Sequence, residues 1–225
     1  SDYAQQWNSA ETVVRGCLQQ WMHQHPGALE GWWTWQAALI LPTACNVVYA
    51  SSMPVRELEA FWCQNAAHRY FYANRGANGI DGTISTARGI ARSTRRPTYL
   101  FIGDLAFLHD ANGLLNAHRA EESLTILVFN NDGGGIFEHL PIARHQESFE
   151  PLFATPQGVD VASLCASYGV AHESSHQVEP IIAALRQAPA RGIRVLEWLS
   201  NREQDKTARE KWLSELAHSV EMNHT

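Results

Sequence analysis

The chain has 225 residues, of which 45% are hydrophobic and 18% are charged, a composition that suits a packed core and excludes a disordered chain. The 23 acidic residues outnumber the 17 basic ones and give a formal charge of −6, so non-specific nucleic-acid binding has no electrostatic support. We find neither an apolar run of the roughly 18 residues that a membrane span needs nor an export signal. The four cysteines form no CxxC pair, and we expect reduced thiols in a cytoplasmic protein.

The first part of the chain predicts two aromatic-rich helices, over residues 3–24 and 29–40, separated by His25-Pro26-Gly27. The first helical pattern begins without a capping motif before it, which suggests a chain cut from something longer. We therefore expect residues 1–42 to be a helical lead-in or linker to one large domain over residues 43–225.

After Pro42 short apolar runs alternate with helical patterns. The predicted strands cover residues 46–50, 69–73, 98–102, 124–129 and 193–199, and the predicted helices cover residues 54–62, 82–93, 105–120 and 204–218. Continuous apolar strands separated by helices are typical of an α/β fold, a doubly wound parallel sheet with helices on both faces. Ligands of such sheets bind at the carboxyl ends of the strands.

Polar residues follow two successive predicted strands at their carboxyl ends. Asp104 follows the strand that ends at Ile102, and Asn131, 27 residues further on, follows the strand that ends at Phe129. One crossover unit of this length can bring both side chains to one edge of the sheet. Together with a backbone carbonyl in the glycine turn they offer the hard oxygen ligands that Mg²⁺ prefers, and glycines and helix-start amides suit a diphosphate.

Each loop also has a plain interpretation, since an Asp that begins a helix is an ordinary cap and Asn-Asn-Asp-Gly is an ordinary turn. Their spacing by one crossover unit favours the metal site. Neither GxxxxGK[ST] nor GxGxxG occurs, so ATP and NAD are not the expected ligands.

Gly103-Asp104 followed by Asn130-Asn131 resembles the signature of thiamine diphosphate enzymes. The resemblance implies that Asp104, Asn131 and the carbonyl of Gly133 bind Mg²⁺ or Mn²⁺. Leu105 stands where the usual signature has glycine, which points away from the decarboxylases and acetolactate synthases.

Three longer strings resemble the MenD family of the menaquinone pathway, from about residue 45 to the end. They are residues 51–56 (SSMPVR), 74–82 (NRGANGIDG) and 130–137 (NNDGGGIF). The resemblance implies a transferase that decarboxylates 2-oxoglutarate on thiamine diphosphate and adds the succinyl-semialdehyde carbanion to isochorismate. It also implies a longer enzyme, a homodimer or tetramer, in which a separate pyrimidine-binding domain carries the activating glutamate. The 225 residues are then a carboxy-terminal diphosphate-binding domain, inactive by itself.

The same resemblance implies roles for individual residues. Arg56 and Arg75, with Ser52, would hold substrate carboxylates, as arginine does in bidentate pairs. Ile136 and Phe137 would line the reacting face, and Ile80 would lie beneath the cofactor. The expected diphosphate contacts are Ser51, Ser52, Gly103, Leu105, Ala106, Gly133 and Gly134.

Plain alternatives remain for these residues: Arg56 as a solvated helix residue paired with Glu57 or Glu59, and the three apolar side chains as core. Two rival functions also remain open. One is another thiamine diphosphate-dependent 2-oxoacid decarboxylase or an acetolactate synthase-like enzyme, whose small uncharged acceptor would not need Arg56 and Arg75. The other is a non-enzymatic regulatory module in which Asp104 binds Mg²⁺; it would need a lysine at a late strand tip, where the chain has Ser200-Asn201-Arg202.

Overall fold

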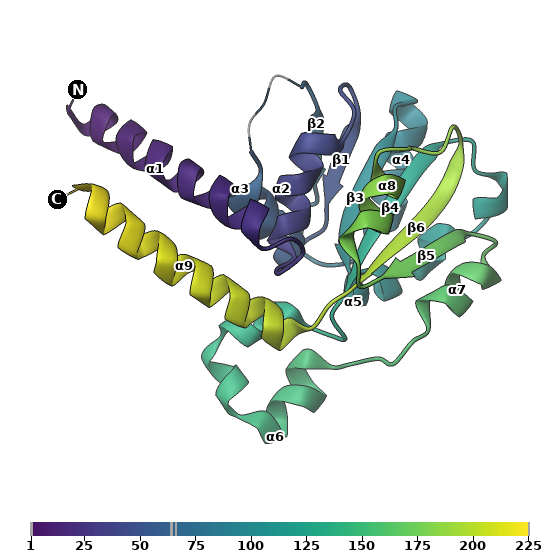
Figure 1. Cartoon of the computed structure of the whole chain (residues 1–225). Helices are drawn as coiled ribbons and strands as arrows, with labels where there is room; N and C mark the ends of the chain where they lie inside the picture. Colours follow the sequence, from purple (N-terminus) through teal and green to yellow (C-terminus); the bar gives the residue numbers. More distant parts are fainter. Residues whose placement is uncertain (1, 64, 66, 225) are drawn as a thin grey trace.

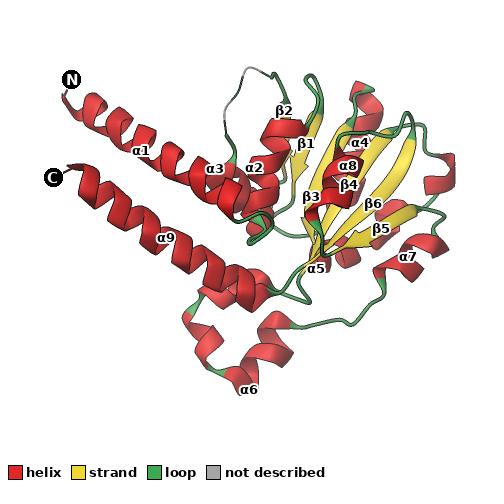
Figure 2. Cartoon of the chain, in the orientation of Figure 1, coloured by secondary structure: helices red, strands yellow, loops and turns green. Residues whose placement is uncertain are grey.

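A six-stranded parallel sheet forms the centre of the computed structural model, which describes residues 2–63, 65 and 67–224 (Figure 2). The strand order is β2-β1-β3-β4-β6-β5, and every neighbouring pair is parallel. The strands are β1 (Asn46–Tyr49), β2 (Tyr70–Ala73), β3 (Thr98–Gly103), β4 (Ser123–Asn130), β5 (Ala171–Ser175) and β6 (Gly192–Leu199). The predicted doubly wound α/β fold is confirmed.

The central strands are buried on both faces, which explains their unbroken apolar runs. Every residue of β1 is buried, and so are all residues of β3 except the last. In the register of β3 and β4, Gly103 lies opposite Phe129. Since the two strands end almost level, the loops that begin with Asp104 and Asn131 start side by side.

Helices cover both faces of the sheet (Figure 1). They are α1 (Asp2–Gln24), α2 (Gly31–Ile40), α3 (Met53–Phe61), α4 (Thr83–Thr94), α5 (Asp104–His109), α6 (Gln146–Phe149), α7 (Val161–Ser167), α8 (Val178–Leu185) and α9 (Arg202–His224). One apolar cluster joins one sheet face to α1, α2, α3, α8 and α9. A second cluster joins the other face to α4, α5 and α7.

The two long helices at the chain ends, α1 and α9, lie side by side and run in opposite directions (Figure 1). Trp212 of α9 packs on Phe61 of α3, with ring centroids 5.1 Å apart. The aromatic residues of α2 are buried, and Trp33 packs edge-on against Trp198 of β6 at 4.9 Å. The first 42 residues thus pack on the same core as the sheet, and a domain boundary at residue 42 remains a prediction.

Two sequence predictions of secondary structure were wrong. The helix expected over residues 105–120 is the six-residue α5, followed by short 3-10 turns at Ala111–Leu114 and Ala117–Arg119. Strand β5 was not predicted at all. Beyond β4 the chain forms further short helical turns at Gly135–His139, Pro141–Arg144 and Glu150–Ala154. Among the described residues, no helix is both long and apolar enough to cross a membrane.

Candidate functional site

Asp104 is a buried carboxyl at the carboxyl end of β3, where α5 begins. Its Oδ2 accepts a hydrogen bond from the backbone N–H of Gly133 (2.7 Å), and its Oδ1 accepts one from Leu105 (2.8 Å). Burial raises the pKa of Asp104 to about 6, although these two hydrogen bonds lower it; the nearby Asp132 raises it further. Within the described part of the chain, no Lys, Arg or His forms an ion pair with this carboxyl. A buried acid without a counter-charge is a favourable place for a cation.

Asn131 follows β4 and is also buried. Its Nδ2 donates to Oε1 of Glu30 at 2.7 Å, whereas its Oδ1 is buried without any hydrogen-bond partner. Buried oxygens normally accept a hydrogen bond, so the Oδ1 atom of Asn131 is a candidate ligand-binding atom. The hydrogen bond of Asp104 to Gly133 brings this loop against the tip of β3.

Gly133 gives the loop its course. Its φ is +136°, and a Cβ at this position would lie 2.3 Å from the carbonyl oxygen of Ala154. A side chain is therefore excluded both by the backbone conformation of Gly133 and by the nearby backbone of Ala154. The backbone of Gly133 stays free to approach Asp104.

The residues present fit a hard divalent cation. Asp104, Oδ1 of Asn131 and the carbonyl of Gly133 supply carboxylate, amide and backbone oxygens, a set typical of Mg²⁺ sites that leave other positions to phosphate and water. The described residues contain no group of three or more His, Cys, Asp or Glu side chains that could hold a metal ion. The donor set at this edge of the sheet therefore suits Mg²⁺ or Mn²⁺ and does not resemble a zinc site.

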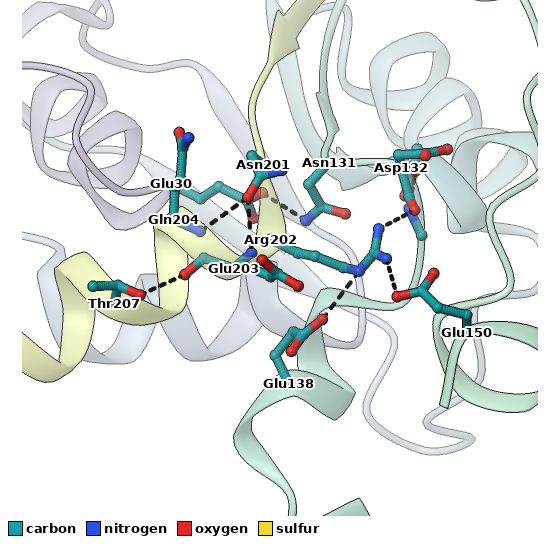
Figure 3. A network of polar contacts seen from close by, with 12 residues as sticks. Glu30, Asn131, Asp132, Glu138, Glu150, Asn201, Arg202, Glu203, Gln204 and Thr207 are labelled. Carbon is teal, nitrogen blue, oxygen red and sulfur yellow. Dashed lines mark hydrogen bonds and ion pairs between the residues drawn. The ribbon is translucent and has the colours of Figure 1, made fainter. Parts of the chain in front are cut away.

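Arg202, the first residue of α9, holds this loop from the other side (Figure 3). Its guanidinium donates to the carbonyl oxygen of Asp132 at 2.7 Å and pairs with Glu138 at 3.0 Å and with Glu150 at 2.5 Å. One arginine thus joins the loop after β4, residues 131–134, which is the candidate metal-site loop, to the short helices that follow it.

The predicted carboxylate-binding residues lie after β1 and β2, which are the first and second strands on the side of β3 away from β4. Ser51 and Ser52 follow β1, and Ser51 is buried with its hydroxyl donating to the carbonyl of Asn74 at 3.3 Å. Ser52 has an unusual φ of +77°, and the exposed Arg56 donates to its carbonyl oxygen at 2.6 Å. Arg75 is exposed in the loop after β2. Because all these strands are parallel, both arginines stand at the sheet edge that carries Asp104.

The remaining predicted residues surround the same edge. Gly103 and Leu105 are half-buried on either side of Asp104, and Ala106 is buried. The side chain of Ile80 packs against the apolar cluster under α4. Ile136 and Phe137 are half-buried in the turn Gly135–His139, and the Phe137 ring lies 5.6 Å from that of Phe153. A Cβ on Gly134 would lie 2.6 Å from the carbonyl of Phe153. Helix α5 has only six residues, whereas the sequence predicted a helix over residues 105–120. The helix dipole that α5 offers to a diphosphate is therefore smaller than that of the predicted helix.

Sequence reasoning missed the residues that support the site, namely Glu30, Ser200 and Arg202. Glu30 precedes α2 and is 4% exposed. Burial, and next the charge of Asp205, raise the pKa of Glu30 well above its usual range. No local pattern distinguishes these residues, because their partners are 52 to 175 residues away in sequence.

Comparison with known proteins identifies the family of the chain. Residues 53–197 match the family described as "Thiamine pyrophosphate enzyme, C-terminal TPP binding domain". The chain belongs to this family of thiamine pyrophosphate enzymes. The match excludes the regulatory module as the class of protein.

Within this class the chain groups with the MenD family. It is 44% identical over 217 residues to the 2-succinyl-5-enolpyruvyl-6-hydroxy-3-cyclohexene-1-carboxylate synthase of Synechococcus elongatus. The aligned residues cover 96% of this chain and 37% of the relative. It is 47% identical over 210 residues to the synthase of the same name from Synechococcus sp. (strain JA-3-3Ab), with coverage of 93% and 35%. The chain thus spans little more than a third of the length of these relatives.

Solved structures show the same fold at low sequence identity. Benzoylformate decarboxylase from Polynucleobacter necessarius superposes with a TM-score of 0.61 at 17% identity, over 77% of this chain and 33% of that one. A thiamine diphosphate-dependent 4-hydroxybenzoylformate decarboxylase from Rhodococcus jostii RHA1 gives 0.63 at 18% identity, over 76% and 32%. These likenesses concern the fold alone.

Proposed function

We propose that this chain supplies the diphosphate- and metal-binding half of the active site of a thiamine diphosphate-dependent transferase of the MenD type. Such an enzyme would decarboxylate 2-oxoglutarate and add the resulting succinyl-semialdehyde unit to isochorismate. The observation that carries the proposal is the meeting of Asp104 with the Gly133 loop, beside a buried Asn131 oxygen that has no partner. When bound, thiamine diphosphate supplies the carbon nucleophile and the electron sink that decarboxylation of a 2-oxoacid requires.

The chain's own residues would bind and orient. Asp104, Asn131 and the Gly133 carbonyl would hold Mg²⁺ or Mn²⁺, and the metal would neutralise the diphosphate. Backbone groups of the loops after β1, β3 and β4 would contact the diphosphate, at Ser51, Ser52, Gly103, Leu105, Ala106, Gly133 and Gly134. Ile80 would support the cofactor from below, and Ile136 and Phe137 would keep water from the reacting face.

Arg56 and Arg75, with Ser52, would bind the substrate carboxylates. Both guanidinium groups are exposed at the sheet edge that carries the metal site, where a partner domain would complete the pocket. This partner would be the pyrimidine-binding domain of the same enzyme, in a homodimer or tetramer. We also propose a cytoplasmic location, which agrees with the four free cysteines.

The test replaces Arg56 and Arg75 by alanine, one at a time, in the complete enzyme that carries this chain. Loss of a charge-assisted hydrogen bond to a carboxylate costs about 1.5–3 kcal/mol, so we expect kcat/KM for one of the two substrates to fall about 10- to 100-fold. Arg92→Ala, in the last turn of α4, is the matched control and should leave kcat/KM unchanged.

Two results would contradict the proposal. One is unchanged kinetics in both arginine variants. The other is equally fast turnover of a 2-oxoacid without a second carboxylate, which would favour another 2-oxoacid decarboxylase of this class.

A further inference from the structure

One face of the Asn131 side chain is fixed by a residue 101 positions earlier in the chain, Glu30. Oε1 of Glu30 accepts two hydrogen bonds, from Nδ2 of Asn131 at 2.7 Å and from the hydroxyl of Ser200 at 3.1 Å. In this arrangement Oε1 accepts both bonds, as it does in an ionised carboxylate or in a neutral carboxyl that is protonated on Oε2. Only the NH₂ end of the Asn131 amide can face it.

The amide oxygen of Asn131 must therefore point away from Glu30. There it is buried and without a hydrogen-bond partner. Gly135 leaves the space for this orientation, because a Cβ at that position would lie 2.8 Å from Nδ2 of Asn131. The amide is thus held by Glu30 and has room beside Gly135, with its oxygen left free for a ligand.

Glu30, whose side chain lies against Asn131 in Figure 3, is itself held by two further hydrogen bonds. Its backbone N–H donates to Oδ1 of Asp205 in α9 at 2.6 Å, and Ser200 stands at the end of β6. The carboxyl is thus fixed from α9 and from β6, two elements that do not contain the metal-site loop. A rigid partner is what orientation of a metal ligand requires.

We propose that Glu30 is a positioning residue that turns the amide oxygen of Asn131 toward the divalent metal ion. The inference rests on the proposed function, because that function makes Asn131 a metal ligand. Glu30 lies in the part of the chain that the sequence predicted to be a lead-in, so the lead-in takes part in building the site.

The test measures Mn²⁺ affinity by electron paramagnetic resonance in the complete enzyme, without substrate. Loss of a hydrogen-bond partner of a metal ligand typically weakens metal affinity about 10- to 100-fold, and we expect this loss for Glu30→Leu. Glu30→Gln keeps an acceptor oxygen for Nδ2 and should stay within about threefold of the wild type. Glu57→Leu is the matched control, since Glu57 is equally buried, pairs with Arg209 and has no hydrogen bond to Asn131.

A polarity swap provides a second, independent test. Asn131→Asp replaces the donor that faces Glu30 by an acceptor, whereas Asn131→Asp combined with Glu30→Gln provides a fixed donor and acceptor with reversed direction. We expect the double variant to bind Mn²⁺ at least about tenfold more tightly than Asn131→Asp alone and to recover its melting temperature. If Glu30→Leu fails to fold, the comparison of the double variant with Asn131→Asp still tests the positioning role of Glu30.

The outcomes separate the two proposals. Asp104→Ala should abolish Mn²⁺ binding; if it does not, the metal lies elsewhere and the proposed function fails. If Asp104→Ala abolishes binding while folded Glu30→Leu binds as the wild type does, only the positioning role is overturned. A double variant no better than Asn131→Asp would overturn it as well.

Discussion

Gly133 shows most clearly how a single residue builds the site. Its φ of +136° and the 2.3 Å separation between a hypothetical Cβ and the carbonyl oxygen of Ala154 both exclude a side chain. Gly133→Ala must therefore move the loop that carries the N–H bound to Asp104.

We expect Gly133→Ala to lower the free energy of unfolding by about 2 kcal/mol, the usual cost of such a backbone conformation for a residue with a Cβ. Urea denaturation measures the change. Gly89→Ala is the control, because Gly89 lies within α4 with nothing near its Cβ position, and alanine there should stabilise the helix. Equal stabilities for Gly133→Ala and the wild type would show that the loop relaxes freely.

The sequence predicted residues of the candidate site only where the local sequence pattern and the strand topology are enough to place them. Asp104 and Asn131 each follow an apolar run, and a right-handed crossover places neighbouring parallel strand ends together. Glu30 has no such signal: it precedes a helix, as many acidic residues do, and its partner Asn131 is 101 residues away. Only the folded arrangement of α2, β4 and β6 shows that they meet.

At the scale of elements, α9 docks onto the domain through buried polar side chains. Asp205 accepts from the backbone of Glu30, and Arg209 pairs with Glu57 of α3. Burial raises the pKa of Glu57 to about 8; Arg209 lowers this pKa, and Asp205 raises it. Burial raises the pKa of Asp205 as well.

This packing predicts a pH-dependent stability. Between the ordinary pKa of 4.5 and about 8, folded Glu57 keeps a proton that the unfolded chain releases. The free energy of unfolding therefore falls as pH rises through this window, by up to about 1.4 kcal/mol for each pH unit from this one group. Denaturation at several pH values should show a smaller slope for Glu57→Gln.

Glu122→Gln is the control for this slope. Burial alone would raise the pKa of Glu122, yet backbone hydrogen bonds and its pairing with Arg88 at 2.8 Å hold it below the usual range. Its titration lies below the window, so the slope above pH 5 should not change. An unaltered slope in Glu57→Gln would mean that Glu57 is ionised in the fold.

The elements that the sequence did not predict have physical reasons. Strand β5 reads Ala-His-Glu-Ser-Ser, lies at the edge of the sheet and is largely exposed, so it shows no apolar run. The helix expected over residues 105–120 ends at His109, and the left-handed conformation of Asn116, φ +59°, separates the two 3-10 turns that follow it. The buried central strands were predicted because burial on both faces makes them apolar throughout.

At the scale of the molecule, we propose that the described residues form the diphosphate half of a site. The chain covers 37% of the length of its Synechococcus elongatus relative, and its match is to a C-terminal cofactor-binding domain. Arg56 and Arg75 are exposed, as expected for groups whose pocket is completed by another domain. The contacts of the pyrimidine half would then be missing from the 225 residues.

We therefore expect the isolated chain to have negligible synthase activity and to bind thiamine diphosphate with Mg²⁺ only weakly, because half of the contacts that offset the entropy of binding are absent. Isothermal calorimetry measures the affinity, and product formation from 2-oxoglutarate and isochorismate measures the activity. Addition of the separately produced remainder of the enzyme should restore turnover, and Asp104→Ala in this chain should prevent the restoration. Micromolar or tighter cofactor affinity, or turnover by the chain alone, would show that these residues hold a complete site.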